Sequence, residues 1–298
     1  MLTEIQWTSW PGPDGALVPG YTFNPWSGCT RVSSACTSCY AEAAPPSMRR
    51  GAQWGPAAPR VHASEAYWRG PVQWNAAAAK RGERRRVFCA SMSDVFEQHQ
   101  DAAEQAKLEA ARERLFALVA ATPSLDWLLL TKRAAAMAAW ARRHPWPANA
   151  WAGCTAEGQR EFDERAPHLL SVPARYRFLS IEPIRERISF GTALGACECV
   201  VESLEGAGQH SPRCPATRPR IDWVIVGGES GRGAAMVPVD AVHDVVRRCC
   251  GAGVACFVKQ LGSAWASQRQ GLHQKGGDPL EWHESLRVRQ WPDQPWRA

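Results

Sequence analysis

The chain has 298 residues, which is longer than one average domain but normal for an α/β barrel. Hydrophobic residues make up 45% and charged residues 21%, so a large core is expected and disorder is not the default. No apolar run is long enough to span a membrane. The net charge of +6 suits anionic partners such as nucleotides or nucleic acid without requiring them.

Seven short apolar runs, each bounded by turn residues or a helical pattern, are predicted to be buried parallel strands. Three stretches between them have the composition and stop signals of helices. In chain order, the strands are expected at 21–24, 87–90, 127–130, 150–154, 176–179, 223–226 and 255–258, and the helices at 102–121, 134–143 and 239–251. This alternation predicts an α/β fold, a partial (β/α) barrel of the TIM type.

The loop after the first predicted strand carries Cys29, Cys36 and Cys39 in the spacing C-x6-C-x2-C. Three thiolates can hold three irons of a [4Fe–4S] cluster, whereas a cluster that only carries electrons is normally closed by a fourth thiolate. The spacing therefore predicts an open iron, where a substrate or cofactor can bind. Residues 1–7 lack the features of a secretory signal, so we expect a cytoplasmic protein whose clustered cysteines bind metal rather than form disulfides.

Polar side chains follow the predicted strands at the points where they end. The carboxyl ends of parallel strands in a barrel meet on one face, and that face carries the chemistry. Solvation of the loops would account for one or two such residues, but we favour a convergent site. The candidates are Ser91, Ser93, Asp94, Lys132, Thr155, Glu157, Glu182, Glu229 and Lys259.

Five segments together resemble a known group of proteins: 24–29, 36–42, 178–183, 223–231 and 257–260. The three-cysteine loop resembles that of the radical SAM superfamily, although the usual first gap is three residues instead of six. In that superfamily an aromatic residue often precedes the third cysteine; here Ser38 stands there and Tyr40 follows. The segments are most similar to the phage-type three-Cys-motif family, which is mostly of unknown function.

The resemblance implies cofactors and an electron source. S-adenosylmethionine (SAM) would chelate the open iron of a [4Fe–4S] cluster and be cleaved reductively to a 5′-deoxyadenosyl radical. An external donor of the flavodoxin or ferredoxin type would supply the electron. The favoured substrate is a nucleobase or hypermodified base, free or in DNA.

The resemblance also implies roles for the strand-end residues. The ammonium of SAM would be accepted by Ser91, Ser93 and Asp94. Its ribose hydroxyls would contact Thr155 and Glu157, and Tyr40 would bind the cofactor as well. Four catalytic residues are predicted. Glu182 and Glu229 would serve SAM or the substrate, and Lys132 and Lys259 would bind an anionic group of the substrate or donate protons.

The predicted barrel comprises 1–190 and 221–265. An insertion at 191–220 interrupts it before its last two strands, and a tail at 266–298 is expected to pack on the barrel. The insertion contains four metal-ligand side chains, which could hold a zinc ion or be incidental in a variable loop. They are Cys197, Cys199, His210 and Cys214.

Two other functions fit the same residues. One is an iron–sulfur or zinc protein that binds nucleic acid without SAM chemistry. The other is a zinc-dependent hydrolase with Glu182 or Glu229 as its base. A basic stretch at 80–86 is either a solvated loop or an edge that contacts phosphates.

Overall fold

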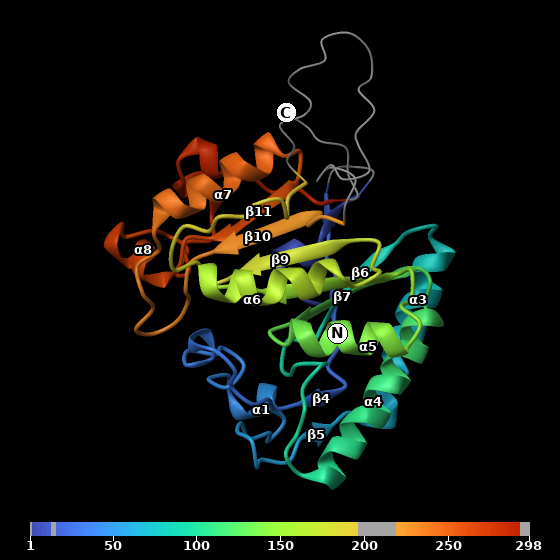
Figure 1. The fold of residues 1–298 in the computed structure, drawn as a ribbon. Helices are drawn as coiled ribbons and strands as arrows, with labels where there is room; N and C mark the ends of the chain where they lie inside the picture. The colour runs from blue at the N-terminus through green and yellow to red at the C-terminus, as the bar shows by residue number, and fades with distance from the viewer. Residues whose placement is uncertain (1, 13–15, 196–218, 293–298) are drawn as a thin grey trace. The chain divides into compact units, whose positions relative to one another are not determined.

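The computed structural model describes residues 2–12, 16–195 and 219–292, and Figure 1 shows the course of the chain. Its main sheet has seven strands in the order β11-β10-β9-β8-β7-β6-β3. The alternation of parallel strands with helices confirms the predicted α/β fold of the partial-barrel type. The strands are β3 (Tyr21–Thr22), β6 (Arg85–Cys89), β7 (Leu125–Thr131), β8 (Ala150–Thr155), β9 (Arg177–Ile181), β10 (Trp223–Gly227) and β11 (Ala255–Gln260).

The chain forms two compact units, each of which is described by itself. The first comprises 1–154 with 172–175, and the second comprises 155–171 with 176–298. In the first unit, β3, β6, β7 and β8 pair in parallel, with Tyr21 opposite Val87 and Val87 opposite Trp127. Nearly every residue of β6, β7 and β8 is buried, as continuous apolar strands predict.

The helices of the first unit are α1 (Pro46–Arg49), α2 (Glu65–Trp68), α3 (Gly70–Lys80), α4 (Ala102–Ala120) and α5 (Ala134–Arg143). Asp101 caps α4 by accepting a 2.8 Å hydrogen bond from the amide of Glu104. The apolar stripe of α4 is buried at Leu108, Leu115 and Val119, which fixes the face that this helix turns to the core.

Short elements complete the first unit around the cysteine loop. Two small antiparallel sheets pair β1 (Trp10–Pro11) with β2 (Leu17–Val18) and β4 (Trp26–Ser27) with β5 (Val61–His62). The 3-10 helices are η1 (Gln6–Thr8) and η2 (Ser34–Cys36).

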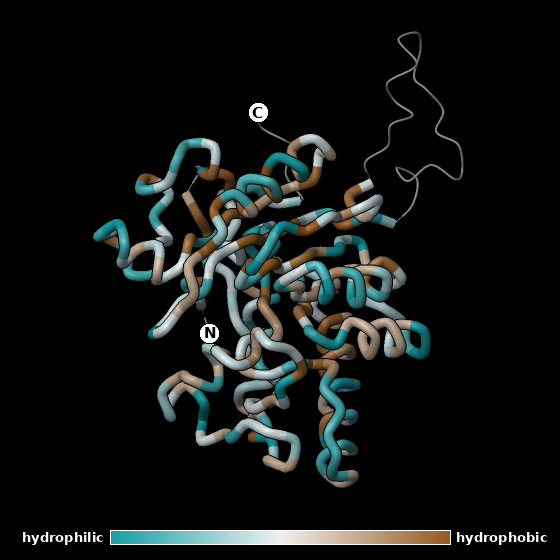
Figure 2. The backbone as a smooth tube through the Cα atoms, turned by 60° about the vertical axis from the view of Figure 1, so that its left-hand side comes forward, coloured by the Kyte–Doolittle hydropathy of each residue, from teal (hydrophilic) through white to brown (hydrophobic). Residues whose placement is uncertain are grey.

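In the second unit, β10 lies between β9 and β11, with Trp223 opposite both Phe178 and Ala255. Helix α7 packs on β10 and β11 (Figure 1), and the tube in Figure 2 shows these strands as largely hydrophobic. The remaining elements are α6 (Gln159–Leu170), α7 (Val239–Gly251), α8 (Ser263–Gln268), η5 (Pro279–Glu281) and η6 (Glu284–Leu286).

The segment after α8 returns to the edge of β11. Arg289 forms an antiparallel bridge with Phe257, and the amide of Gln290 donates a 2.8 Å hydrogen bond to the carbonyl of Cys256. Trp282 and Trp291 are buried there. This segment therefore covers an edge that would otherwise expose unpaired backbone groups.

Among the described residues, the α-helices without a counterpart among the predicted elements are α1, α2, α3, α6 and α8, of which α3 and α6 are the longest. Helix α3 opens with Gly70 and Pro71, and α6 contains Pro167, so both carry residues that usually mark a helix boundary. Within the described residues, no helix has the length and apolar character needed to cross a membrane.

The basic stretch at 80–86 largely takes part in the fold. Arg84 forms a bidentate pair with Asp126, with its shorter contact at 2.6 Å. Arg85 and Arg86 are buried in β6, which begins two residues before the predicted strand, and the Arg86 guanidinium lies over the ring of Trp151. Lys80, Arg81 and Arg84 are exposed, but Arg84 is paired with Asp126, so a phosphate-contacting edge here stays a prediction.

Candidate metal and cofactor site

The cysteine loop starts at a glycine that its surroundings require. Gly28 has a φ of 103°, and a Cβ atom there would lie 2.9 Å from the carbonyl oxygen of Gln53 and 3.1 Å from Cδ of Arg60. Any residue with a side chain would have a strained backbone at this position and would push the turn away from its neighbours. Gly28 thus fixes the position of Cys29, the next residue.

Both ends of the cysteine loop are attached to the segment that follows β6. At the start, the amide of Gly28 donates to the carbonyl of Met92 at 3.0 Å, and the Asn24 side chain accepts from the amide of Met92 at 2.8 Å. At the end, the phenol of Tyr40 donates to the carbonyl of Ser91 at 2.7 Å. The loop is therefore held at the carboxyl end of β6.

Cys36 and Cys39 lie on tight turns. The amide of Cys36 donates to Ser33, that of Cys39 donates to Cys36, and Ala43 donates back to Cys39, over 3.0 to 3.3 Å. All three cysteines of the loop are free thiols and half-buried. Soft thiolates in this number are the ligand set of an iron–sulfur cluster, so the donor chemistry fits the group.

Among the described residues, no three Cys, His, Asp or Glu side chains are gathered around a point where one metal ion would sit. Ligands of a single ion must converge within about 2.0 to 2.3 Å of it. In a cubane cluster each thiolate binds a different iron, so its three sulfurs do not converge on one point.

A buried ion pair lies beneath the start of the loop. The guanidinium of Arg60 contacts the Glu97 carboxylate at 2.8 and 3.0 Å, and both side chains have 0% exposure. Arg60 also donates to Oγ1 of Thr30, while Glu97 accepts from the Thr30 amide at 2.7 Å. The residue after Cys29 is therefore tied to a fully desolvated pair, where hydrogen bonds to charged groups are strong.

Asp94 has a carboxylate surrounded by donors. One oxygen accepts from the hydroxyl of Thr131 and the amide of Phe96, and the other accepts from the amide of Lys132 and the guanidinium of Arg133. Burial alone would raise the pKa of Asp94, but the charge of Arg133 and these hydrogen bonds outweigh it and lower the pKa. All of the roughly four lone-pair positions of this carboxylate are occupied.

Arg133 links Asp94 to the first cysteine. Its Nη1 lies 3.6 Å from Sγ of Cys29, and its Nη2 donates to the carbonyl of Thr30 at 2.8 Å. Burial, followed by the charges of Asp94 and Glu97, raises the pKa of the Cys29 thiol to about 12, and Arg133 counteracts part of that rise. In the metal-free protein Cys29 is accordingly a neutral thiol at pH 7.

Ser91 and Ser93 border the same loop. The Ser91 hydroxyl lies 3.1 Å from Nδ2 of Asn24. The Ser93 hydroxyl oxygen is buried and has no hydrogen-bond partner among the described residues. A buried hydroxyl without a partner is costly, and a bound polar group would satisfy it.

Lys132 uses its amide to hold Asp94, and its half-buried side chain forms no ion pair within the described parts of the chain. The structure thus brings Tyr40, Ser91, Asp94 and Lys132 together around the loop that starts at Cys29.

The predicted ribose ligands belong to the second unit. Arg165 donates through one nitrogen to the carbonyl of Thr155 at 2.7 Å and to the carboxylate of Glu157 at 3.0 Å. Glu157 is 1% exposed, and its carbonyl accepts from the amide of Arg185. Thr155 is the last residue of β8 and Glu157 follows it closely. Their role in ribose binding stays a prediction.

The predicted catalytic residues of the second unit fall into two groups. Lys259 and Glu182 form a 2.5 Å ion pair at the ends of β11 and β9, with 33% and 15% of their side chains exposed. Glu229 instead accepts from the amide of Ala235 at 3.0 Å and so closes its own loop. The glycine at 228 admits backbone of the same unit, because a Cβ atom there would lie 2.4 Å from the carbonyl oxygen of Leu261.

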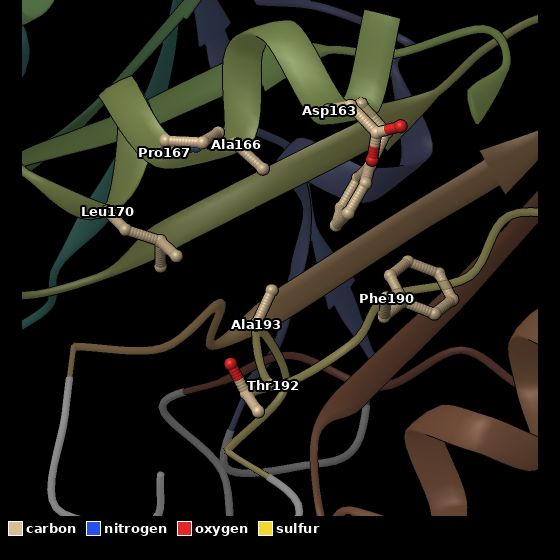
Figure 3. A pocket seen from close by; sticks show the side chains of 8 residues that line it. Asp163, Ala166, Pro167, Leu170, Phe190, Thr192 and Ala193 are labelled. Carbon is tan, nitrogen blue, oxygen red and sulfur yellow. The ribbon is translucent and has the colours of Figure 1, made fainter. Parts of the chain in front are cut away.

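The second unit also contains a cavity of about 240 Å³ beside α6. Figure 3 shows side chains of α6 facing those of 190–193 across it. The lining is mainly apolar, with Asp163 and Thr192 as polar members, and it includes none of the predicted site residues. The four predicted zinc ligands, Cys197, Cys199, His210 and Cys214, lie outside the described residues.

Four residues of the site were missed in the sequence. Arg133 stands directly after a predicted strand, so the rule that selected Lys132 could have found it. Arg60 and Glu97 occur in loops without a motif, and only the fold brings them to Cys29. Asn24 opens the segment 24–29, but its hydrogen bond to the amide of Met92 has no signal in the sequence. Their role is visible from burial and contacts alone.

Fold and site together define an α/β protein with a three-cysteine loop attached at the carboxyl end of a parallel strand. The chain belongs to the family described as "Protein of unknown function (DUF5131)", whose sequence model matches residues 3–288. No curated protein matches it.

Solved structures of spore photoproduct lyase resemble the chain. A tyrosine-to-phenylalanine variant has a TM-score of 0.39 and 13% identity, with coverage of 68% of this chain and 54% of that one. A cysteine-to-alanine variant has a TM-score of 0.37 and 14% identity, with the same coverage. The chain spans about half the length of these structures.

Proposed function

We propose that this protein is a radical SAM enzyme that holds a [4Fe–4S] cluster on Cys29, Cys36 and Cys39. The observation that carries the proposal is the loop itself. Three free thiols lie within eleven residues, and hydrogen bonds at Gly28 and Tyr40 hold both ends of the loop. A fourth cysteine is missing from this loop, which leaves one iron for an outside ligand.

When bound, the cluster and SAM supply one electron and a 5′-deoxyadenosyl radical. The protein's own part is to place the cofactor and exclude competing reactions. Ser91 and Ser93 would accept hydrogen bonds from the ammonium of SAM, and the partnerless hydroxyl of Ser93 supports this role. Asp94 remains a candidate for the same role, although four donors already occupy its carboxylate.

Other side chains are assigned by their position. Thr155 and Glu157 are the candidates for the ribose hydroxyls, and Tyr40 would contact the cofactor from the end of the cysteine loop. Lys132, whose ammonium has no ion partner among the described residues, would bind an anionic group of the substrate. The pair Glu182–Lys259 would bind substrate or move a proton; Glu229, which closes its loop, is the weaker fourth candidate.

The substrate class in this proposal is a nucleobase or hypermodified base, free or in DNA. It rests on the sequence resemblance and on the net charge of +6. A flavodoxin or ferredoxin type of protein would supply the electron.

Anaerobic reconstitution with iron and sulfide, followed by incubation with dithionite and SAM, tests the proposal. We expect a brown protein that forms 5′-deoxyadenosine, and a Cys36→Ala variant that does not. Iron without SAM cleavage would favour an iron–sulfur protein that only binds nucleic acid. Zinc without iron would favour the hydrolase, and either result would overturn the proposal.

A further inference from the structure

The guanidinium of Arg133 lies beside the sulfur of Cys29, the first cysteine of the loop. Its Nη1 lies 3.6 Å from Sγ of Cys29, within reach of an N–H···S hydrogen bond. The neighbouring Nη2 donates to the Thr30 carbonyl, so the guanidinium contacts the sulfur and the next peptide together. A planar guanidinium that donates in two directions has little freedom to turn away.

Two carboxylates hold Arg133 from behind. Asp94 accepts from Nη1 at 2.9 Å, and the Glu97 carboxylate lies 3.7 Å from Nη2. Only 12% of the Arg133 side chain is exposed, so solvent hardly competes for these contacts. Burial alone would lower the pKa of Arg133, but the carboxylates of Asp94 and Glu97 raise it above its usual value, and the group stays cationic.

The charges around Cys29 form a balanced set. Asp94 and Glu97 carry two negative charges, and Arg60 and Arg133 carry two positive ones. Of these four side chains, Arg133 is the one that contacts the Cys29 sulfur. Without Arg133, the negative charges of Asp94 and Glu97 near the Cys29 thiolate would be balanced by Arg60 alone. The remaining negative charge would repel an electron added to a cluster at this position.

We propose that Arg133 is a positioning residue that donates an N–H···S hydrogen bond to Cys29 and raises the reduction potential of the bound cluster. Hydrogen bonds to cluster sulfurs and nearby charge set such potentials. The inference rests on the proposed function, since it requires a cluster on Cys29. It assigns to this chain a tuning device outside the three cysteines.

The test is an EPR-monitored redox titration of reconstituted protein without SAM. For Arg133→Gln we expect a more negative midpoint potential, by at least the amount of a tenfold change in the reduction equilibrium, about 59 mV for one electron. Arg133→Lys keeps the charge and should recover part of the shift. Arg142→Gln, at an exposed position on α5, removes one positive charge elsewhere and should leave the potential unchanged.

A purely structural role would reduce cluster content but leave the potential of the loaded fraction at the wild-type value, which would overturn the inference. Equal shifts in the Arg133→Gln and Arg142→Gln proteins would overturn it too. If Arg133→Gln does not fold, Arg133→Lys decides. Lysine keeps the charge but lacks the planar fork of the guanidinium, so we expect a smaller negative shift. A midpoint potential equal to that of the wild type would contradict the inference. Absence of any cluster in the wild-type protein would refute the proposed function itself.

Discussion

The phenol of Tyr40 donates a 2.7 Å hydrogen bond to the backbone carbonyl of Ser91. Fifty-one residues separate the two, yet this bond attaches the end of the cysteine loop to the segment that follows β6. Tyr40 is directly after Cys39, so the bond restricts the position of the third thiol.

Tyr40→Phe removes this hydroxyl and keeps the ring. We expect faster amide exchange across 36–43 and weaker retention of iron, because a hydrogen bond of this kind contributes about 1 kcal/mol. Hydrogen exchange with mass spectrometry and iron analysis after dialysis measure the effect. Tyr21→Phe is the matched control, since the structure shows no hydrogen bond for that hydroxyl among the described residues. Equal behaviour of the two variants would contradict the anchoring role.

Replacing any one of Cys29, Cys36 and Cys39 by alanine should abolish most iron binding, because each thiolate would hold a different iron. The measurement is iron and sulfide per chain after anaerobic reconstitution. The exposed Cys250 is the control position, and Cys250→Ala should bind as much iron as the wild type. Full iron content in any one of the three loop variants would remove that residue from the ligand set.

Glu97→Gln should destabilise the metal-free protein by about 3 kcal/mol, because it leaves the fully buried Arg60 guanidinium without its counter-charge. Urea denaturation followed by circular dichroism gives the change in unfolding free energy. Glu65 pairs with Arg114 at the surface, with 72% of the Glu65 side chain exposed, so Glu65→Gln is a suitable control and should change little. Similar losses in both variants would argue against a special role of the buried pair.

Cys29 should react slowly with iodoacetamide in the metal-free protein. Burial and the nearby carboxylates raise its pKa to about 12, so only ~10⁻⁴ of it is thiolate at pH 8, against roughly a quarter of an ordinary thiol. Because the folded pKa is the higher one, the contribution of this group to stability is complete below about pH 8.5 and is lost as the pH rises toward 12.

Peptide mass spectrometry after timed alkylation at pH 8 and pH 9 measures the rate. The rate for Cys29 should rise about tenfold between these pH values, since the thiolate fraction does. The exposed Cys250 provides the reference for fast labelling. Labelling of Cys29 as fast as Cys250 at pH 8 would show that its thiol is not protected by burial.

The strands could be predicted because buried parallel strands are continuous apolar runs. The predicted strand at 255–258 lies within β11, and the predicted helix at 239–251 has the bounds of α7. Helices α3 and α6 escaped because Gly70 and Pro167 break the usual pattern. The paired short strands β4 and β5 are two residues each, too short to leave a periodic signal.

The ligand loop and the strand-end residues were visible in the sequence because each has a local signature. The charges that surround Cys29 were not, since Arg60, Glu97 and Arg133 come from three separate segments. Nothing in their neighbours distinguishes Glu97 from a surface acid, although its side chain has 0% exposure. Long-range pairing of buried charges depends on the fold and leaves no local pattern.

The Arg60–Glu97 pair has a consequence for how iron would enter. Many small metal domains are unfolded until the metal arrives, so that loading and folding are one event. Here the turn that bears Cys29 already rests on a desolvated ion pair and on the β6 segment. Iron would then bind to a loop that is already folded. A chelator could remove the iron, and added iron and sulfide could restore it, repeatedly and without unfolding the protein.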